Sequence, residues 1–254
     1  NAIMQKDDEC IVFTPYFPEY GVFLERTGAK LVAVDSEEKT FQIDIDKFEK
    51  AITEKTKAVI INSPNNPSGV VYTVETIEKM CKVLNDKQEE YGHPIFLITD
   101  EPYRELVYDD TEVPYMINYY DNTFVCYSYS KALSLPGERI GYIVVSPKMV
   151  DEADAYAAVC GAGRALGYVC APSLYQRVIE RCIDETADIS IYKTNRDLLY
   201  NALTEMGYEC VYPDGAFYLF VKAMCEDAHE FCEKAKDYEL LLVPADSFGT
   251  PGYV

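Results

Sequence analysis

Short runs of β-branched and aromatic residues alternate with stretches of helical composition through the first 145 residues of the chain. Alternation of this kind favours a parallel sheet, because a chain that leaves one strand must cross a sheet face before it can add the next strand in parallel. Helices are predicted over Asp46–Glu54 and Val74–Tyr91, where apolar residues recur at helical spacing. The pattern predicts an α/β domain with a mostly parallel sheet flanked by helices. The predicted strands are Cys10–Thr14, Leu31–Val34, Ala58–Asn62, Ile95–Thr99, Phe124–Ser128 and Ile140–Val145.

The pattern changes after Pro147, where two long helical stretches follow each other. We expect them over Lys148 to about Ala162 and over Ser173 to about Met206. A Pro-Asp-Gly turn at Pro213–Gly215 then predicts a strand on each side. This part is interpreted as a smaller α+β domain, so that residues 1–160 form a large domain and residues 161–254 a small one. Its other predicted elements are strands at Tyr208–Tyr212, Ala216–Val221 and Leu240–Val243 and a helix at Cys225–Lys236.

Charge and composition exclude several classes of function. The chain has 43 acidic and 23 basic residues, and a surface field of this sign repels phosphate backbones, so nucleic acid is not expected as a partner. No apolar run approaches the roughly 20 residues of a membrane helix, so no membrane partner is expected either. Nine scattered cysteines without a Cys-x-x-Cys pair, together with only two histidines, predict neither a disulfide framework nor a metal site. The protein is interpreted as cytoplasmic, with reduced thiols.

Polar and aromatic residues follow four of the predicted strands. Ligands of open parallel sheets bind beyond the carboxyl ends of the strands, so these residues are expected to meet in one crevice. Taken singly, each motif has an ordinary structural interpretation: Asn-Pro-Ser-Gly is typical of a turn, and a carboxylate after a strand is typical of a helix cap. Their convergence is what predicts a ligand site. The motifs are Pro15-Tyr-Phe-Pro-Glu-Tyr20, Ser63-Pro-Asn-Asn-Pro-Ser-Gly69, Asp100-Glu-Pro-Tyr103 and Ser128-Tyr-Ser-Lys131.

The last three motifs, in this order, resemble the class I and II aminotransferases, the aspartate aminotransferase superfamily of fold type I. The most specific part is Ser128-Tyr-Ser-Lys-Ala-Leu-Ser-Leu-Pro-Gly-Glu-Arg-Ile-Gly141, and supporting matches run from Pro15 to Phe248. Members of this family bind pyridoxal 5′-phosphate. The resemblance therefore implies a large cofactor-binding domain followed by a smaller C-terminal domain.

The resemblance also implies a role for each matching residue. Lys131 would hold the cofactor as a Schiff base and later move a proton at the substrate α-carbon. Asp100 would pair with the pyridine nitrogen and keep it protonated, because a nearby carboxylate favours the cationic form. Tyr103 and Asn66 would hydrogen-bond the phenolic oxygen of the ring.

Three further residues would complete the cofactor site. Ser128 and Arg139 would bind the phosphate, with Arg139 acting as a charged fork. Phe17 matches the position of an aromatic residue that stacks on the cofactor ring. Tyr16 is its close rival for that role.

These assignments imply an aminotransferase that moves an amino group between an amino acid, aspartate or a related one, and a 2-oxo acid such as 2-oxoglutarate. Two alternatives stay open. A β-lyase or synthase of the same fold would keep Lys131, Asp100, Tyr103 and Arg139 and differ in its substrate contacts. A cofactor-binding regulatory module of a larger protein would keep the site without the reaction. The family is homodimeric, so a homodimer is expected.

The same resemblance leads us to expect a chain truncated at both ends. The family's N-terminal arm and a Gly-containing phosphate-binding loop would lie upstream of Asn1. The arginine that binds the substrate α-carboxylate would lie just past Val254, so the 254 residues alone are expected to have little transaminase activity. Gly161–Gly167 has the wrong spacing for a dinucleotide fingerprint and is interpreted as an interdomain hinge.

Overall fold

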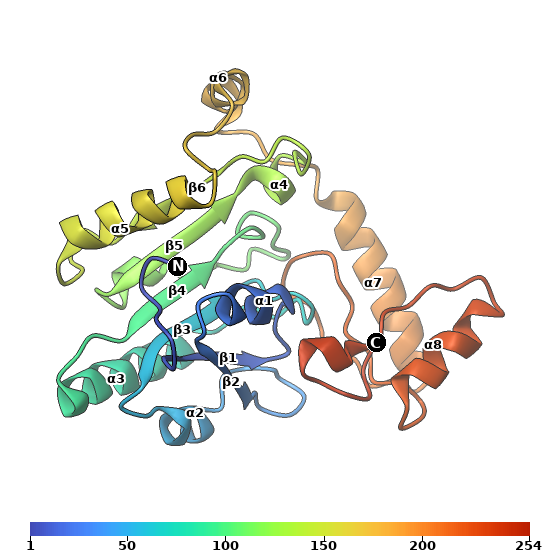
Figure 1. The fold of residues 1–254 in the computed structure, drawn as a ribbon. Coiled ribbons are helices and arrows are strands. Elements are labelled where there is room, and N and C mark those ends of the chain that lie inside the picture. The colour runs from blue at the N-terminus through green and yellow to red at the C-terminus, as the bar shows by residue number, and fades with distance from the viewer.

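Six strands form a single sheet at the centre of the molecule (Figure 1). The computed structural model describes all residues 1–254. The strand order is β2-β1-β3-β4-β5-β6, and every neighbouring pair is parallel except β5 and β6. The predicted mostly parallel sheet is confirmed. Each of the six predicted strands is observed, and its first and last residues differ from the observed ones by at most two positions. The strands are β1 (Glu9–Thr14), β2 (Lys30–Asp35), β3 (Thr56–Asn62), β4 (Phe96–Asp100), β5 (Thr123–Ser128) and β6 (Gly141–Val145).

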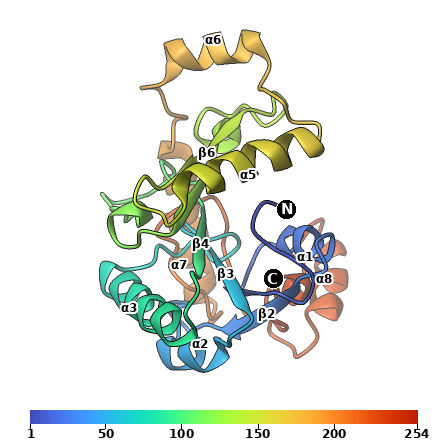
Figure 2. The same ribbon diagram turned by 60° about the vertical axis from the view of Figure 1, so that its left-hand side comes forward.

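Helices cover both faces of the sheet (Figure 2), because alternate side chains of each strand point to opposite faces. On one face α2 (Ile45–Ala51) and α3 (Val74–Tyr91) complete an apolar cluster of 18 buried residues. On the other face α1 (Glu19–Glu25) and α5 (Glu152–Ala165) pack against a cluster of 10 buried residues. Each fully buried aliphatic or aromatic side chain contributes about 1.5–3 kcal/mol, so these two clusters hold the sheet and its ends in place.

Three helices differ from the prediction. The aromatic segment after β1 contains the short helix α1, which was not predicted. Helix α5 continues through Gly161 and Gly163 and ends at Ala165, so the break predicted after about Ala162 begins later, before Gly167 with its φ of +88°. The single helix expected from Ser173 to Met206 is two helices, α6 (Ser173–Cys182) and α7 (Ser190–Glu205). The break occurs where the Ala187 amide donates to the Ala132 carbonyl at 2.7 Å instead of continuing a helix.

The strands predicted after residue 206 are also wrong. The only β contact between the segments 208–212 and 216–221 is an isolated bridge from Cys210 to Val221. The turn between them does not close a hairpin. Its Asp214 and Gly215 amides instead both donate to the Gly69 carbonyl at 2.9 Å. Residues 240–243 form no strand and are mostly exposed.

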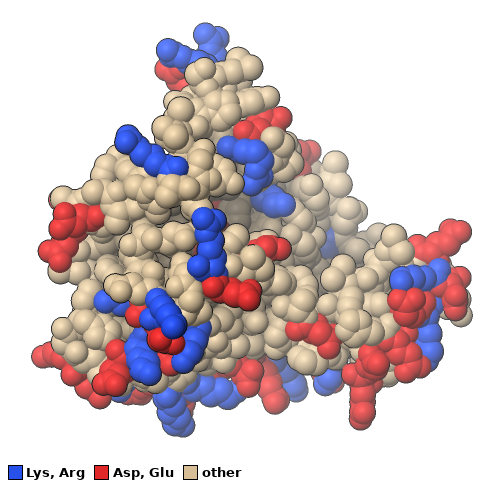
Figure 3. Space-filling model, in the orientation of Figure 1, with Lys and Arg blue, Asp and Glu red and all other residues tan.

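The remaining elements are short or peripheral. A helix was predicted over Cys225–Lys236, but it begins three residues later because the Asp227 side chain caps its first turn, accepting from the His229 and Glu230 amides. No helix is long and apolar enough to cross a membrane. On the face drawn in Figure 3, acidic and basic side chains are mixed along the outer edge of the molecule. The remaining elements are η1 (Met116–Asn118), α4 (Tyr129–Ala132), α8 (Ala228–Lys236) and η2 (Ala245–Phe248).

Candidate active site

The carboxyl ends of β3, β4 and β5 open into one cavity of about 540 Å³. The register explains this convergence, since Asn62 and Asp100, the last residues of β3 and β4, are paired, and Asp100 pairs with Cys126, two residues before the end of β5. Other walls come from α1 and from the segment after the Pro-Asp-Gly turn. All seven residues selected from the sequence line this cavity: Phe17, Asn66, Asp100, Tyr103, Ser128, Lys131 and Arg139.

Side-chain amides fold the loop after β3 against the end of β4. The Asn62 side chain donates to the Asp100 carbonyl at 2.8 Å and accepts the Asn66 amide at 2.7 Å. One step further, the Asn65 side chain accepts from the Ser68 amide and hydroxyl, as asparagine commonly does in turns. The Asn-Pro-Ser-Gly segment is thus a turn, and the same turn places Asn66 at the cavity.

Asp100 is a carboxylate without a cationic partner. Its Oδ2 accepts the Tyr20 hydroxyl at 2.7 Å, and it forms no ion pair. Burial raises the pKa of Asp100 to about 6; the Tyr20 hydrogen bond opposes this rise and the neighbouring Glu101 adds to it. A cation placed beside Asp100 in the cavity would offset the cost of burying its charge.

Tyr103 is buried at the cavity wall and shares a hydrogen bond with a second tyrosine. Its hydroxyl lies 2.8 Å from the Tyr218 hydroxyl. Burial raises the pKa of Tyr103 well above its ordinary value, the Tyr218 contact acts in the same direction, and the Asn66 contact opposes them. Tyr103 is therefore a neutral phenol that can donate a hydrogen bond to a ligand.

Lys131 lies on the four-residue helix α4, directly after β5. The Ser128 hydroxyl caps this helix by accepting the Ser130 amide at 3.1 Å. The Lys131 ammonium lies 5.9 Å from the ring centroid of Tyr103 and 5.2 Å from that of Phe217, and no carboxylate pairs with it. Its amine is thus held between two aromatic rings and faces the cavity without a competing partner.

Arg139 is a second cation without an acidic partner. It is exposed at the cavity rim, and its only hydrogen bond runs from Nη1 to the Pro136 carbonyl at 2.8 Å. Two residues on, Gly141 packs so closely on Tyr127 that a Cβ would overlap the Tyr127 carbonyl and lie 3.1 Å from the Ser128 Cα. The spacing from Ser128 to Gly141 thus returns the chain to β5 with Arg139 near Lys131.

The structure separates the two aromatic candidates after β1. Phe17 lines the cavity, and its ring packs edge-on against Tyr20 with centroids 5.7 Å apart. Tyr16 does not line the cavity, and its amide instead donates to the Phe248 carbonyl at 3.0 Å. Of the two, Phe17 is the ring in position to stack on a ligand.

Comparison with known proteins places this arrangement in a family. The family model described as aminotransferase class I and II matches residues 1–254. The chain belongs to the class I and II aminotransferase family. It is 30% identical over 260 residues to the aspartate aminotransferase of Thermotoga maritima and 32% identical over 265 residues to that of Bacillus subtilis, covering 100% and 98% of this chain and 65% of each relative. The chain thus spans about 65% of the length of the curated relatives that it matches.

Solved structures agree with the assignment. An amino transferase from Eubacterium rectale has a TM-score of 0.97 at 59% identity, covering 99% of this chain and 64% of that one. The aspartate aminotransferase of Thermotoga maritima has a TM-score of 0.85 at 31% identity, covering 99% of this chain and 65% of that one. The predicted family and fold type are confirmed.

Tyr20 and Tyr218 also line the cavity of this aminotransferase-family chain, and the sequence assigned no role to either of them. Tyr20 follows Phe17 by three residues and lies on the unpredicted helix α1, whose first turn aims it at Asp100. Tyr218 lies 115 residues from Tyr103 in sequence. No spacing rule joins such distant positions, although the Pro-Asp-Gly turn just before Tyr218 marks a chain reversal.

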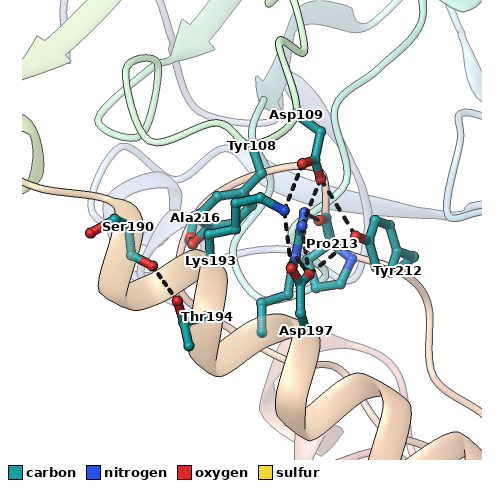
Figure 4. Close-up of polar contacts among 10 residues, drawn as sticks. Tyr108, Asp109, Ser190, Lys193, Thr194, Asp197, Tyr212, Pro213 and Ala216 are labelled. Atoms are coloured by element: carbon teal, nitrogen blue, oxygen red, sulfur yellow. Dashed lines mark hydrogen bonds and ion pairs between the residues drawn. The ribbon is translucent and has the colours of Figure 1, made fainter.

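A cluster of charged and aromatic residues brings Tyr218 to the cavity. We call it the α7 junction (Figure 4). Arg196 of α7 pairs with Asp109 at 2.6 Å and with Asp197 at 2.7 Å. Lys193 pairs with the same two carboxylates, at 2.7 and 3.0 Å. Because Asp109 lies in the loop after Tyr103, the junction fixes α7 to the segment that carries this site residue. Its members are Tyr108, Asp109, Lys193, Arg196, Asp197, Tyr212 and Pro213.

The junction also holds the Pro-Asp-Gly turn. The Arg196 guanidinium lies between the rings of Tyr108 and Tyr212, 4.5 and 4.4 Å from their centroids, and donates to the Pro213 carbonyl at 3.1 Å. Its side chain is only 4% exposed. This arrangement sets the start of the segment that delivers Tyr218 to Tyr103.

Proposed function

We propose that this protein is an aminotransferase that binds pyridoxal 5′-phosphate in the cavity at the ends of β3, β4 and β5. One observation carries the proposal: the cavity gathers a buried carboxylate without a cation, Asp100, and two cations without an anion, Lys131 and Arg139. These charges complement a ring with a protonated nitrogen and a phosphate group. When bound, pyridoxal phosphate supplies an aldehyde that condenses with amines and a ring that withdraws electrons.

The polar residues of the cavity would orient the ring. Asp100 would hold the proton on the ring nitrogen, because a carboxylate in a buried site favours a neighbouring cation. Tyr103, with its raised pKa, and Asn66 would donate hydrogen bonds to the ring oxygen. Arg139 and Ser128 would bind the phosphate, although the Ser128 hydroxyl also caps α4. Phe17 would pack on the ring face.

Lys131 would carry the reactive amine. Its position between Tyr103 and Phe217 holds the amine at the cavity without an ion pair. It would bind the cofactor covalently and, once released by an incoming amino acid, would move the proton at the substrate α-carbon. The aromatic rings of Tyr103 and Phe217 would limit the access of water to this proton transfer.

The proposed substrates are aspartate or a related amino acid and a 2-oxo acid such as 2-oxoglutarate. The names of the Thermotoga and Bacillus relatives support aspartate, and a relative from Thermococcus litoralis that is 29% identical is named an aromatic-amino-acid aminotransferase. We further propose a homodimer, as is typical of the family, in the cytoplasm. The nine unpaired cysteines support a reducing compartment.

Product analysis tests the proposed reaction. The full-length protein is incubated with pyridoxal phosphate, 2-oxoglutarate and single amino acids, and the products are separated. Formation of glutamate together with the 2-oxo acid of the donor is the expected result. Release of ammonia and pyruvate without glutamate would instead identify a β-lyase. Cofactor binding without turnover of any amino acid would indicate a regulatory module.

A further inference from the structure

Tyr20 contacts the one carboxylate at the base of the cavity. Its hydroxyl donates to Asp100 Oδ2 at 2.7 Å across 80 residues of sequence, and only 6% of its surface is exposed. No other side-chain hydrogen bond reaches the Asp100 carboxylate. Tyr20 therefore controls one of its two oxygens, and the other is left for a ligand.

Packing fixes the direction of the Tyr20 hydroxyl. Tyr20 lies in the first turn of α1. Its ring packs against Phe17 and joins the apolar cluster that contains Leu24. A tyrosine has only two side-chain torsions, so a ring packed on both sides leaves its hydroxyl one position.

We propose that Tyr20 is a positioning residue that keeps Asp100 ionised and turns its free oxygen toward the cationic ring nitrogen of the bound cofactor. This inference rests on the proposed function, because it concerns the same site. It assigns a role to Tyr20, the last residue of the Pro15–Tyr20 motif, which received none from the sequence. It also assigns two tasks to the Pro15–Tyr20 segment, since Phe17 would cover the ring face while Tyr20 supports the partner of the ring nitrogen.

The groups around Asp100 make its ionisation depend on Tyr20. Glu101 follows it on the chain, and Cys126 on β5 and Tyr103 after β4 are neutral groups that feel its charge. Lys131 and Arg139 line the same cavity but form no ion pair with it. The Tyr20 hydrogen bond is thus the only neighbouring interaction that lowers the pKa of Asp100 against the effect of burial.

Removal of the Tyr20 hydroxyl should change the pKa of Asp100 in a predictable direction. In Tyr20→Phe the charged form of Asp100 loses a hydrogen bond, so its pKa rises above about 6. A smaller share of Asp100 is then ionised near neutral pH. Because the cofactor's ring nitrogen binds the ionised form, its affinity falls and the acid side of its binding profile moves to higher pH.

The test is a titration of the protein with pyridoxal phosphate, followed by absorbance, from acid to neutral pH. Tyr20→Phe is compared with Tyr120→Phe, a matched control whose buried hydroxyl also donates at 2.7 Å, here to the Ile95 carbonyl. We expect the acid side of the Tyr20→Phe profile to shift upward by about one pH unit, so that binding is about twofold weaker at pH 7 and about tenfold weaker near pH 5. Tyr120→Phe should keep the wild-type affinity and profile.

A double variant keeps the test independent of folding. In an Asp100→Asn background the Tyr20→Phe change should have no further effect on cofactor affinity, because the group it acts through is gone. Equal profiles for Tyr20→Phe and Tyr120→Phe, or additive losses in the double variant, would overturn the inference while leaving the proposed function intact. A wild-type protein that binds no cofactor would overturn both.

Discussion

The sheet and the segment after α5 are stabilised in different ways. Apolar clusters of 18 and 10 buried residues cover the two faces of the sheet. By contrast, the only buried residue of α7 is Arg196, and the apolar cluster of the C-terminal segment has four buried residues, of which Phe41 and Val70 come from the sheet half. The strand ends that carry Asp100 and Lys131 are therefore fixed by hydrophobic packing. Tyr218 is placed by charges and by a tight turn.

Two aspartates show the same contrast electrostatically. Burial raises the pKa of Asp100 to about 6. At the junction, hydrogen bonds from Lys193 and then Arg196 lower the pKa of Asp109 to about 2. The ionised Asp100 carboxylate thus destabilises the folded protein as long as no cation lies beside it. The ionised Asp109 carboxylate, by contrast, stabilises the fold through its ion pairs. Neutralising Asp100 should therefore raise the stability of the protein at neutral pH, whereas neutralising Asp109 in the α7 junction should lower it.

The turn contact at Gly69 should give the largest effect on stability. Gly69 has a φ of +72°, and a Cβ would lie 2.5 Å from the Pro213 Cβ. Gly69→Ala should lower the free energy of unfolding by about 2–5 kcal/mol, because backbone strain and overpacking add. Gly92 has a φ of +69° with nothing within 4 Å of a Cβ, so Gly92→Ala should cost only about 1–2 kcal/mol. Equal losses in chemical denaturation would show that the turn does not depend on this contact.

Arg196→Met should give the next largest effect. The substitution keeps much of the apolar volume but leaves Lys193 as the only cation shared by Asp109 and Asp197 and removes the hydrogen bond to the Pro213 carbonyl, and we expect a loss of about 2–3 kcal/mol. Hydrogen exchange should rise around Pro213–Tyr218 and stay low in the sheet. The control is Arg177→Met, because the Arg177 pair with Glu180 is mostly exposed and should contribute less than about 0.5 kcal/mol. Uniformly faster exchange across the sheet would contradict a local role.

Asp100→Asn should stabilise the cofactor-free protein at neutral pH. Between pH about 4 and about 6 the folded state retains a proton on Asp100 that the unfolded chain has lost, so stability falls as pH rises through this window. The amide removes that cost, and we expect a gain of about 1–3 kcal/mol at pH 7 that is absent near pH 3. No gain at pH 7 would mean that the carboxylate is already compensated.

Asp109→Asn should behave in the opposite way. Its lowered pKa contributes stability that is present above the unfolded value and is lost as pH falls from about 4 through about 2. The variant should therefore be less stable than the wild type at neutral pH and equal to it in strong acid. Thermal unfolding over this pH range measures the difference, and a loss that persists at the lowest pH would point to packing rather than charge.

Local sequence patterns predicted the sheet well because each strand carries its own signal. The runs from Ala58 and Phe124 are β-branched or aromatic and end in polar motifs, so both strands and strand-end residues could be placed. Helix breaks and turns that depend on residues distant in sequence could not be predicted in this way. The gap between α6 and α7 follows from the Ala187 bond to Ala132, and the turn before Tyr218 bonds to Gly69 rather than to a strand partner.

The same reasoning explains which site residues were found. Lys131, Asp100 and Asn66 follow strands directly, so the sheet alone brings them together. Tyr20 depends on an unpredicted helix, and Tyr218 depends on the α7 junction. A buried arginine between two tyrosines leaves no local pattern, because its partners are spread from Asp109 to Pro213.

Site-specific labelling tests the central claim most directly. The protein is mixed with pyridoxal phosphate, reduced with borohydride, digested and analysed by mass spectrometry. We predict that the cofactor is fixed on the peptide that contains Lys131, that Lys131→Ala abolishes this product, and that Lys148→Ala, at an exposed lysine after β6, leaves it unchanged. Labelling spread over surface lysines, with no preference for Lys131 and no change in Lys131→Ala, would contradict the account.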